Sequence, residues 1–185
     1  MSERRIGDWC QTASGVAFYP LDPRVEDIKI YDIAHALSMQ CRFNGHCVKF
    51  YSVAEHCVRV SDAVSREHAP WALLHDATEA YLVDLPRPLK HYSELGNQFQ
   101  LVENKLARCI CERFGLPLIE PPEVKKVDQI LLMTEQRDLM VSPPAAWSWG
   151  IIEKPFVYPI IPWSQEMAKA QFLQRFNNLF NSSLW

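Results

Sequence analysis

Long apolar runs are absent from this 185-residue sequence. No segment approaches the roughly 20 consecutive apolar residues that a membrane-crossing helix needs. The first residues, MSERRIGDWCQTASG, include two arginines but no apolar stretch after them, which is unlike a secretory signal. We therefore expect a cytoplasmic protein with no membrane partner.

An excess of positive charge is also missing. The chain has 19 Lys and Arg residues against 22 Asp and Glu residues, which gives a net charge of -3. Proteins that grip a nucleic acid backbone use clustered Lys and Arg side chains. We therefore expect no nucleic acid polymer as a partner. The length suits one domain with an ordinary buried core.

No cysteine pair has the C-x-x-C spacing of many redox and zinc sites. The six cysteines are Cys10, Cys41, Cys47, Cys57, Cys109 and Cys111. A chain without an export signal is expected to keep its thiols reduced. A zinc knuckle built from Cys41, His46 and Cys47 is one alternative. We favour the other, in which the cysteines act as small apolar residues.

Apolar residues recur at the helical spacing i, i+3, i+4, i+7 along most of the chain. Strands do not alternate with helices, so the pattern predicts an all-α, single-domain helical bundle over residues 1–185. An irregular cap is expected at 1–26, and a loop rich in Pro and Trp at 141–163. A capping box, Ser52 to Glu55, marks one helix start. The expected helices cover residues 30–37, 53–64, 70–83, 95–114, 123–140 and 168–179.

The stretch ALLHDATEAYLVDLP, residues 72–86, brings charged side chains into an apolar helical pattern. Polar groups removed from water cost free energy unless something pairs them. On one continuous helix, His75 and Glu79 would share a face and Asp76 would lie about 100° around it. Imidazole and carboxylate groups together suit a divalent metal ion.

Two more polar residues interrupt apolar helical runs, His56 in VAEHCVRV and Asp128 in VDQILL. Taken singly, each is more often a surface or hydrogen-bonded residue than a ligand. With His75 and Asp76, however, they place four ligand-type side chains on three core helices. We predict one divalent ion bound by His56, His75, Asp76 and Asp128. The mixed N/O set suits Co, Mn, Fe, Ni or Zn, and Mg is possible.

Three segments together, SVAEHCVRVSD, ALLHDATEAYLVDLPRPLK and VKKVDQILLMTEQRDLM, resemble the HD-domain metal-dependent phosphohydrolases. Within them the chain is most similar to the small 5'-deoxynucleotidase-like HD proteins of bacteria, prophages and phages. The resemblance extends from DIAHALSMQCRFNGH to about residue 140. It implies an HD-type helical bundle, the four metal ligands above, and a homo-oligomer.

The resemblance also implies roles for residues outside the ligand set. Asp76 and Glu79 would be catalytic, with Glu79 handling the proton of the attacking water. Arg42 would bind the 5'-phosphate, and Asp84 would lie near the sugar. Phe43 stands where the family has tryptophan, which leaves discrimination between deoxyribose and ribose open. Two further candidate substrate contacts, His46 and Arg87, come from their positions in the sequence and not from the resemblance, and Lys90 could add positive potential beside Arg87.

Plainer interpretations remain for several of these residues. Arg42 could be a surface arginine, His46 an uncommitted loop histidine, and Glu79 an exposed helix residue paired with a lysine. The acidic and basic residues of TEQRDL, Glu135, Arg137 and Asp138, are interpreted as a charge network on a helix surface.

The expected function is therefore release of phosphate from deoxynucleoside 5'-monophosphates by a metal-dependent enzyme. One alternative is a dNTP triphosphohydrolase, which releases triphosphate and needs more cationic side chains around the phosphate tail. Another alternative is a non-catalytic nucleotide-binding or interaction module with a vestigial metal site.

Overall fold

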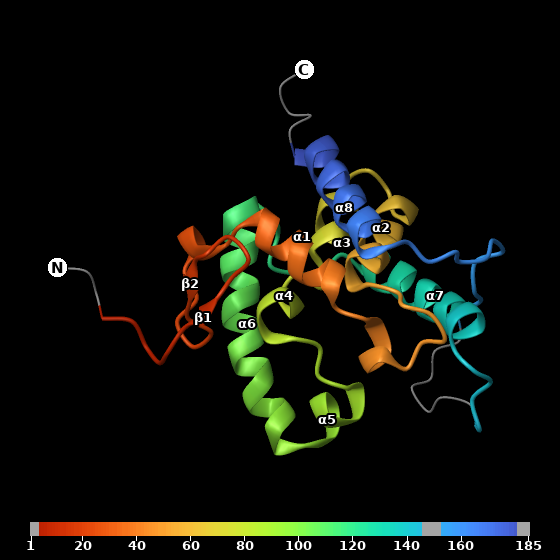
Figure 1. Cartoon of the computed structure of the whole chain (residues 1–185), viewed down its shortest axis with the longest axis horizontal. Coiled ribbons are helices and arrows are strands. Elements are labelled where there is room, and N and C mark those ends of the chain that lie inside the picture. Colours follow the sequence, from red (N-terminus) through yellow and green to blue (C-terminus); the bar gives the residue numbers. More distant parts are fainter. Residues whose placement is uncertain (1–3, 146–152, 181–185) are drawn as a thin grey trace. The chain divides into compact units, whose positions relative to one another are not determined.

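The computed structural model describes residues 4–145 and 153–180 and confirms the all-α class (Figure 1). Its contacts divide the chain into two compact units. The first contains residues up to Leu37 together with Asp76–Leu118, and the second contains Ser38–His75 and the described residues from Ile119 onward. This division does not test the prediction of a single domain. Among the described residues, no helix combines the length and apolarity that a membrane span requires.

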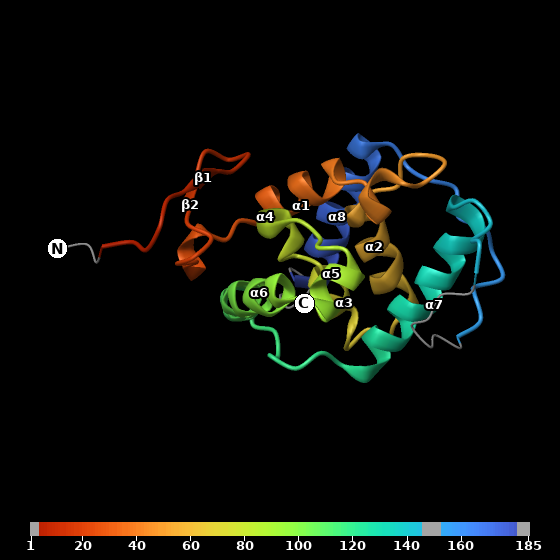
Figure 2. The same ribbon diagram turned by 90° about the horizontal axis from the view of Figure 1, so that it is seen from below.

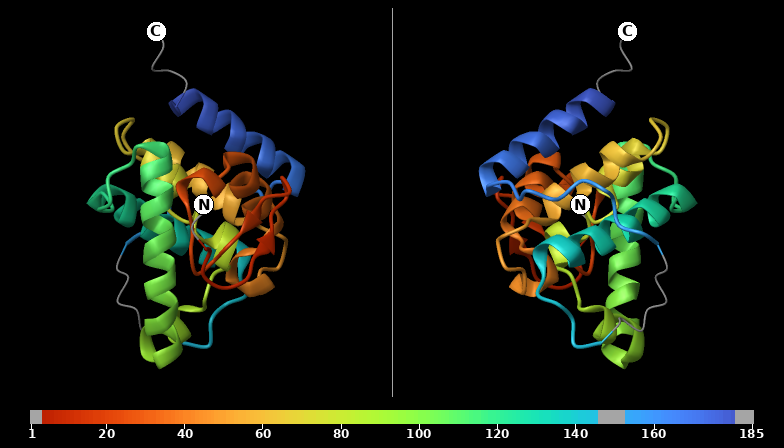
Figure 3. Two further views of the ribbon diagram at one scale, coloured as in Figure 1. Left: turned by 90° about the vertical axis from the view of Figure 1, so that its left-hand side faces the viewer. Right: turned by 90° about the vertical axis from the view of Figure 1, so that its right-hand side faces the viewer.

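The first unit is built around one long helix, α6 (Glu94–Phe114). The Ser93 hydroxyl accepts a hydrogen bond from the Gly96 N–H at its start, and Gly115 ends it in the left-handed conformation. The short helix α5 (Arg87–Tyr92) packs at the N-terminal end of α6, as Figure 3 shows. The unit also contains β1 (Cys10–Gln11), β2 (Ala17–Phe18), the 3-10 helix η1 (Val25–Asp27), most of α1 (Ile30–Met39) and α4 (Glu79–Leu82).

Contact between α5 and α6 depends on the missing side chain of Gly96. A Cβ atom at this position would lie 2.2 Å from the carbonyl oxygen of Lys90 and 2.5 Å from that of Leu89. The N-terminal hairpin is antiparallel, with Cys10 opposite Phe18. The ring of Phe18 packs on that of Tyr81, with 4.3 Å between ring centroids.

The second unit packs α2 (Val53–Ala63) against α3 (Ala69–Leu74), α7 (Pro122–Leu139) and α8 (Gln165–Phe180) (Figure 2). Helix α2 is buried along most of its length because three helices cover it. The second unit also contains the 3-10 helix η2 (Arg42–Gly45). The shared apolar core is formed by Tyr51, Val60, Ala72, Val124, Val127, Leu131, Leu139 and Ile160.

Side chains of α2 and α7 hold the extended segment Phe156–Trp163 through its backbone. Phe156 N–H donates to the Thr134 hydroxyl, Ile160 N–H to the Asp138 carboxylate, and Trp163 N–H to the Glu55 carboxylate. This part of the predicted Pro- and Trp-rich loop is therefore ordered by specific hydrogen bonds. Residues 146–152 of that loop lie outside the described residues.

The predicted helices at 30–37, 53–64, 95–114, 123–140 and 168–179 are confirmed as α1, α2, α6, α7 and α8. The capping box is half confirmed. The Ser52 hydroxyl accepts from the Glu55 N–H at 3.1 Å, but the Glu55 carboxylate accepts from Arg59 and from the Trp163 N–H.

A continuous helix over residues 70–83 is wrong. Helix α3 ends at Leu74 and α4 begins at Glu79. Between them, the N–H groups of Glu79 and Ala80 bond the carbonyls three residues back, which gives tighter turns than an α-helix. His75 and Glu79 therefore do not occupy successive turns of one α-helix. The prolines of LPRPLK do stop a helix, but Pro88 also fits the first turn of α5.

Candidate metal centre

His56 lies in the middle of the buried helix α2, and its side chain is fully buried. Both of its ring nitrogens contact carboxylates of α7. Nδ1 is 2.7 Å from Oε1 of Glu135, and Nε2 is 3.1 Å from Oδ1 of Asp128. An imidazole without a partner would be costly at this depth. The two carboxylates therefore fix its position and orientation.

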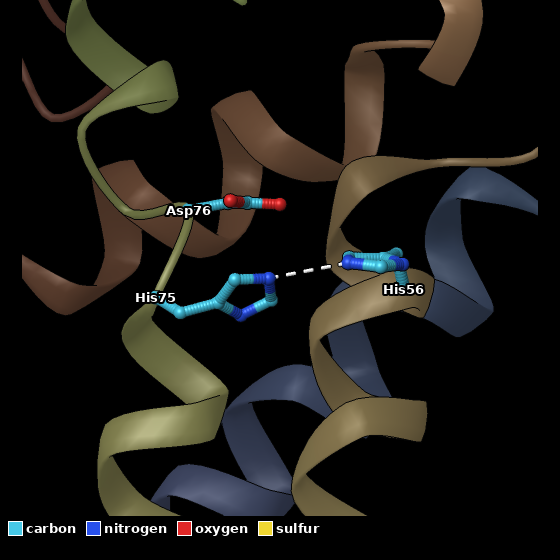
Figure 4. A group of neighbouring side chains, drawn as sticks. All are labelled: His56, His75 and Asp76. Atoms are coloured by element: carbon cyan, nitrogen blue, oxygen red, sulfur yellow. Dashed lines mark hydrogen bonds between the residues drawn. The ribbon is translucent and has the colours of Figure 1, made fainter. Parts of the chain in front are cut away.

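His75 is the residue at which α3 ends. Its Nδ1 is 2.7 Å from the carbonyl oxygen of Ala72, which can only accept, so Nδ1 carries the proton. The opposite nitrogen, Nε2, lies 3.2 Å from Nε2 of His56 (Figure 4).

The facing nitrogens form a set of acceptors. The Nδ1 atoms contact Glu135 and the Ala72 carbonyl, so in neutral rings that carry their protons on Nδ1 both Nε2 atoms present lone pairs. The Asp128 carboxylate adds negative charge at the same nitrogen of His56. Lone pairs and a carboxylate at these distances repel one another unless a proton or a metal cation lies between them. The donor chemistry therefore fits a metal ion.

Asp76 follows His75 directly and completes the cluster. One ligand atom from each of His56, His75 and Asp76 lies within 4.8 Å of the other two, so these three residues could hold a metal ion. Nitrogen and oxygen ligands together are compatible with several divalent metals. Within residues 4–145 and 153–180, Cys41, His46 and Cys47 form no such group, so the zinc knuckle is not supported.

Glu135 is the buried anion of this site, and its side chain is fully inaccessible. Burial alone would raise the pKa of its carboxyl, but Arg42 and His56 reverse this effect and the net pKa is lowered. Because its pKa is lowered, Glu135 is ionised. Burial and Arg42 lower the pKa of His56. The charge of Glu135 and the hydrogen bonds to Asp128 and Glu135 raise it by more, so the net pKa of His56 is raised.

Arg42 and its neighbours lie in and beside η2, in the same unit. The Arg42 guanidinium is 3.1 Å from Oε2 of Glu135. Phe43 adopts the left-handed conformation, with φ 54°, and its ring centroid lies 5.4 Å from the guanidinium carbon of Arg42. His46 is exposed and follows η2. Their predicted contacts with substrate stay predictions.

The remaining predicted site residues belong to the other unit. Glu79 opens α4, Asp84 is exposed after Val83, and Arg87 is the exposed first residue of α5. Lys90, which was expected to add positive potential, is 2.8 Å from the Glu103 carboxylate. The roles predicted for these residues also stay predictions.

Glu135 was missed by sequence reasoning, which interpreted it as part of a surface charge network. That interpretation is wrong for Glu135 because its side chain is buried against His56 and Arg42. It is correct in one respect, since Arg137 pairs with Asp138 at 2.7 Å. The available signal was spacing: Glu135 follows Asp128 by seven residues, about two helical turns, and so lies on the same face of α7.

Comparison with known proteins gives the chain's relationships. No family model matches it. An Escherichia coli (strain K12) protein, "Uncharacterized protein YfdR", is 42% identical over 170 residues, which covers 91% of this chain and 94% of that protein. A Rhodobacter capsulatus protein, "Uncharacterized protein RCAP_rcc00048", is 36% identical over 127 residues, which covers 64% of each. The chain belongs to the family of the Escherichia coli protein YfdR.

Proposed function

We propose that this protein is a metal-dependent phosphohydrolase that releases phosphate from deoxynucleoside 5'-monophosphates. The observation that carries the proposal is the cluster of facing acceptors. Nε2 of His56 lies 3.2 Å from Nε2 of His75 and 3.1 Å from the Asp128 carboxylate, an arrangement that a cation would stabilise. The nucleotide substrate rests on the resemblance of the surrounding motifs to HD-domain phosphohydrolases.

The metal-site residues have a plain chemical role in this proposal. His56, His75, Asp76 and Asp128 would hold one divalent ion. Such an ion, when bound, polarises a phosphoryl oxygen and lowers the pKa of a bound water toward neutrality. Glu79 would accept the proton of the attacking water as general base. Cobalt, manganese, iron, nickel and zinc suit this ligand set, with magnesium as a further possibility.

Substrate recognition would use four further residues that the sequence predicts. Asp84 would contact the sugar, the Phe43 ring would pack on the nucleoside, and His46 and Arg87 would approach the phosphate. The 5'-phosphate role that the resemblance gives to Arg42 must be reconciled with the ion pair between Arg42 and Glu135. The proposed enzyme is cytoplasmic and homo-oligomeric.

The test is phosphate release from a panel of dNMPs, NMPs and dNTPs, with each divalent metal and with a chelator. We expect orthophosphate from dNMPs, lost on chelation and in His75→Ala. Triphosphate release from dNTPs would establish the triphosphohydrolase alternative instead. A protein that binds metal but hydrolyses nothing in the panel would be the non-catalytic module.

A second pair of variants separates binding from chemistry. Glu79→Gln should keep metal affinity and lose about 100-fold or more in kcat, because a general base typically contributes 10²–10⁴-fold. Glu94→Gln is the matched control, since Glu94 is an exposed residue in the first turn of α6. Equal kcat values for the two variants would remove Glu79 from the mechanism.

A further inference from the structure

We infer that Glu135 and Arg42 are positioning residues for the metal centre, with Glu135 orienting His56 and Arg42 holding Glu135. The inference rests on the cation site of the proposed function and deepens it. Neither residue is among the expected metal ligands. Their effect would pass to the metal through the ring of His56.

Two carboxylates on one face of α7 orient the ring of His56. Asp128 and Glu135 are separated by seven residues, which is about 10 Å along a helix. Their carboxylates contact opposite edges of the same imidazole, Asp128 at Nε2 and Glu135 at Nδ1. With the Glu135 carboxylate at Nδ1, Nε2 is the ring nitrogen that faces His75, at 3.2 Å from its Nε2. A metal-ligating histidine commonly has its other nitrogen held in this way.

The two oxygens of the Glu135 carboxylate contact two different partners. Oε1 faces Nδ1 of His56 at 2.7 Å, whereas Oε2 faces Nε and Nη2 of Arg42, each at 3.1 Å. The Glu135 side chain is fully buried and the Arg42 side chain is 15% exposed. Arg42 therefore holds the Glu135 carboxylate in place against the ring of His56.

The Arg42 backbone is anchored just before α2. The Arg42 N–H donates to the Tyr51 carbonyl at 2.9 Å, and the Cys47 thiol donates to the Arg42 carbonyl at 3.5 Å. Phe43 and Asn44 both have left-handed backbone angles, with φ 54° and 51°. Residues other than glycine rarely adopt this conformation. The surrounding structure therefore fixes the chain at the point from which Arg42 reaches Glu135.

This arrangement gives Arg42 a consequence that a phosphate clamp would not have. If Arg42 served phosphate alone, its removal would spare metal affinity. If it acts through Glu135, its removal weakens metal binding even without nucleotide. Metal affinity of the nucleotide-free protein therefore separates the two roles.

The experiment is calorimetric titration of metal-free protein with Mn²⁺ or Co²⁺. We expect Glu135→Gln to weaken binding about 10- to 100-fold, the range found when a residue that orients a metal ligand is lost. Arg42→Ala should weaken it in the same direction, and Arg42→Lys should restore part of the loss. The matched control is Glu123→Gln, because Glu123 also contacts a histidine Nδ1 but lies at the surface. Unchanged affinity in folded Glu135→Gln would overturn the inference.

A second measurement needs no variant and therefore stands if Glu135→Gln does not fold. Long-range ¹⁵N–¹H NMR of the metal-free wild-type protein should show a proton on Nδ1 of His56. A bare Nδ1 with the proton on Nε2 would overturn the inference. This result is independent of catalysis. An Nδ1 proton together with no phosphate release would leave the positioning role intact and reject the proposed function.

Discussion

Two histidine–glutamate pairs in the second unit share the same chemistry in different surroundings. In both, a histidine Nδ1 faces a carboxylate oxygen, at 2.7 Å for His56–Glu135 and 2.5 Å for His68–Glu123. Both members of the first pair have fully buried side chains. In the second pair the side chains are 32% and 38% exposed.

Because the two distances are similar, we infer that burial decides how much each pair contributes to stability. An exposed ion pair is screened by water and contributes little to stability. Glu123 accepts hydrogen bonds from Ser65 as well as from His68, and so it joins the end of α2 to the start of α7. Glu135 has no access to water, and removing either partner would strand a buried charge. The first pair supports a candidate metal centre, whereas the second is a surface contact.

The largest expected effect is on stability when each histidine is removed. His56→Ala should lower the free energy of unfolding by about 3 kcal/mol or more, because a buried charge loses a partner and a void is left. His68→Ala should lower it by less than about 1 kcal/mol. Urea unfolding of the metal-free proteins measures both values. Equal losses of unfolding free energy in the two variants would contradict the difference drawn between the buried and the exposed pair.

A steric substitution in the first unit tests burial without charge. Gly96→Ala places a Cβ atom against the backbone carbonyls of Leu89 and Lys90, so α5 or α6 must shift. We expect a loss of about 1–3 kcal/mol in unfolding free energy, as for other overpacked sites. The control is Asn97→Ala at an exposed position of the same helix. A Gly96→Ala protein as stable as the control would mean that the two helices do not meet as described.

Burial also separates two thiols. Burial and the nearby Cys41 thiol raise the pKa of Cys47 to about 12. At pH 8 only about one Cys47 in ten thousand is then a thiolate, the reactive form. Brief iodoacetamide treatment should alkylate the exposed Cys10 and leave Cys47 unmodified, as read by peptide mass spectrometry. Rapid labelling of Cys47 in the folded protein would contradict its partial burial and the hydrogen bond from its thiol to the Arg42 carbonyl.

The smallest expected effect is the acid dependence of the exposed pair. The hydrogen bonds from Ser65 and His68 lower the pKa of Glu123 below its ordinary value of 4.5. Its stabilising contribution is therefore present above pH 4.5 and lost as the pH falls through the lower folded-state value. The parent protein should lose some unfolding free energy between about pH 6 and about pH 3. The Glu123→Gln variant should lose only slightly less over the same range. A large change would show that this surface pair matters as much as the buried one.

Much of this arrangement could be predicted from the sequence. Apolar residues at helical spacing located α2, α6 and α7. His56 and Asp128 stood out because they interrupt apolar runs. The break between α3 and α4 could not be predicted, since no proline or glycine interrupts residues 71–83 and only the structure shows the i→i+3 bonds.

Glu135 shows the other limit of prediction from sequence. In the segment TEQRDL, Glu135 looks like its charged neighbours. Its burial depends on contacts with His56 and Arg42, which precede it by 79 and 93 positions. Local pattern carries no information about such distant partners. The same limit applies to Arg42. Its ion pair with Glu135 is not visible in the sequence, so only a contact with phosphate was expected for it.

The most direct test of the central claim is a crystal structure of the protein soaked with Mn²⁺ or Co²⁺, with anomalous scattering used to locate the ion. The account predicts one strong peak between Nε2 of His56 and Nε2 of His75, at about 2.0–2.3 Å from each nitrogen, with carboxylate oxygens of Asp76 and Asp128 also bound. No peak at this position, or a peak held by other residues, would contradict it.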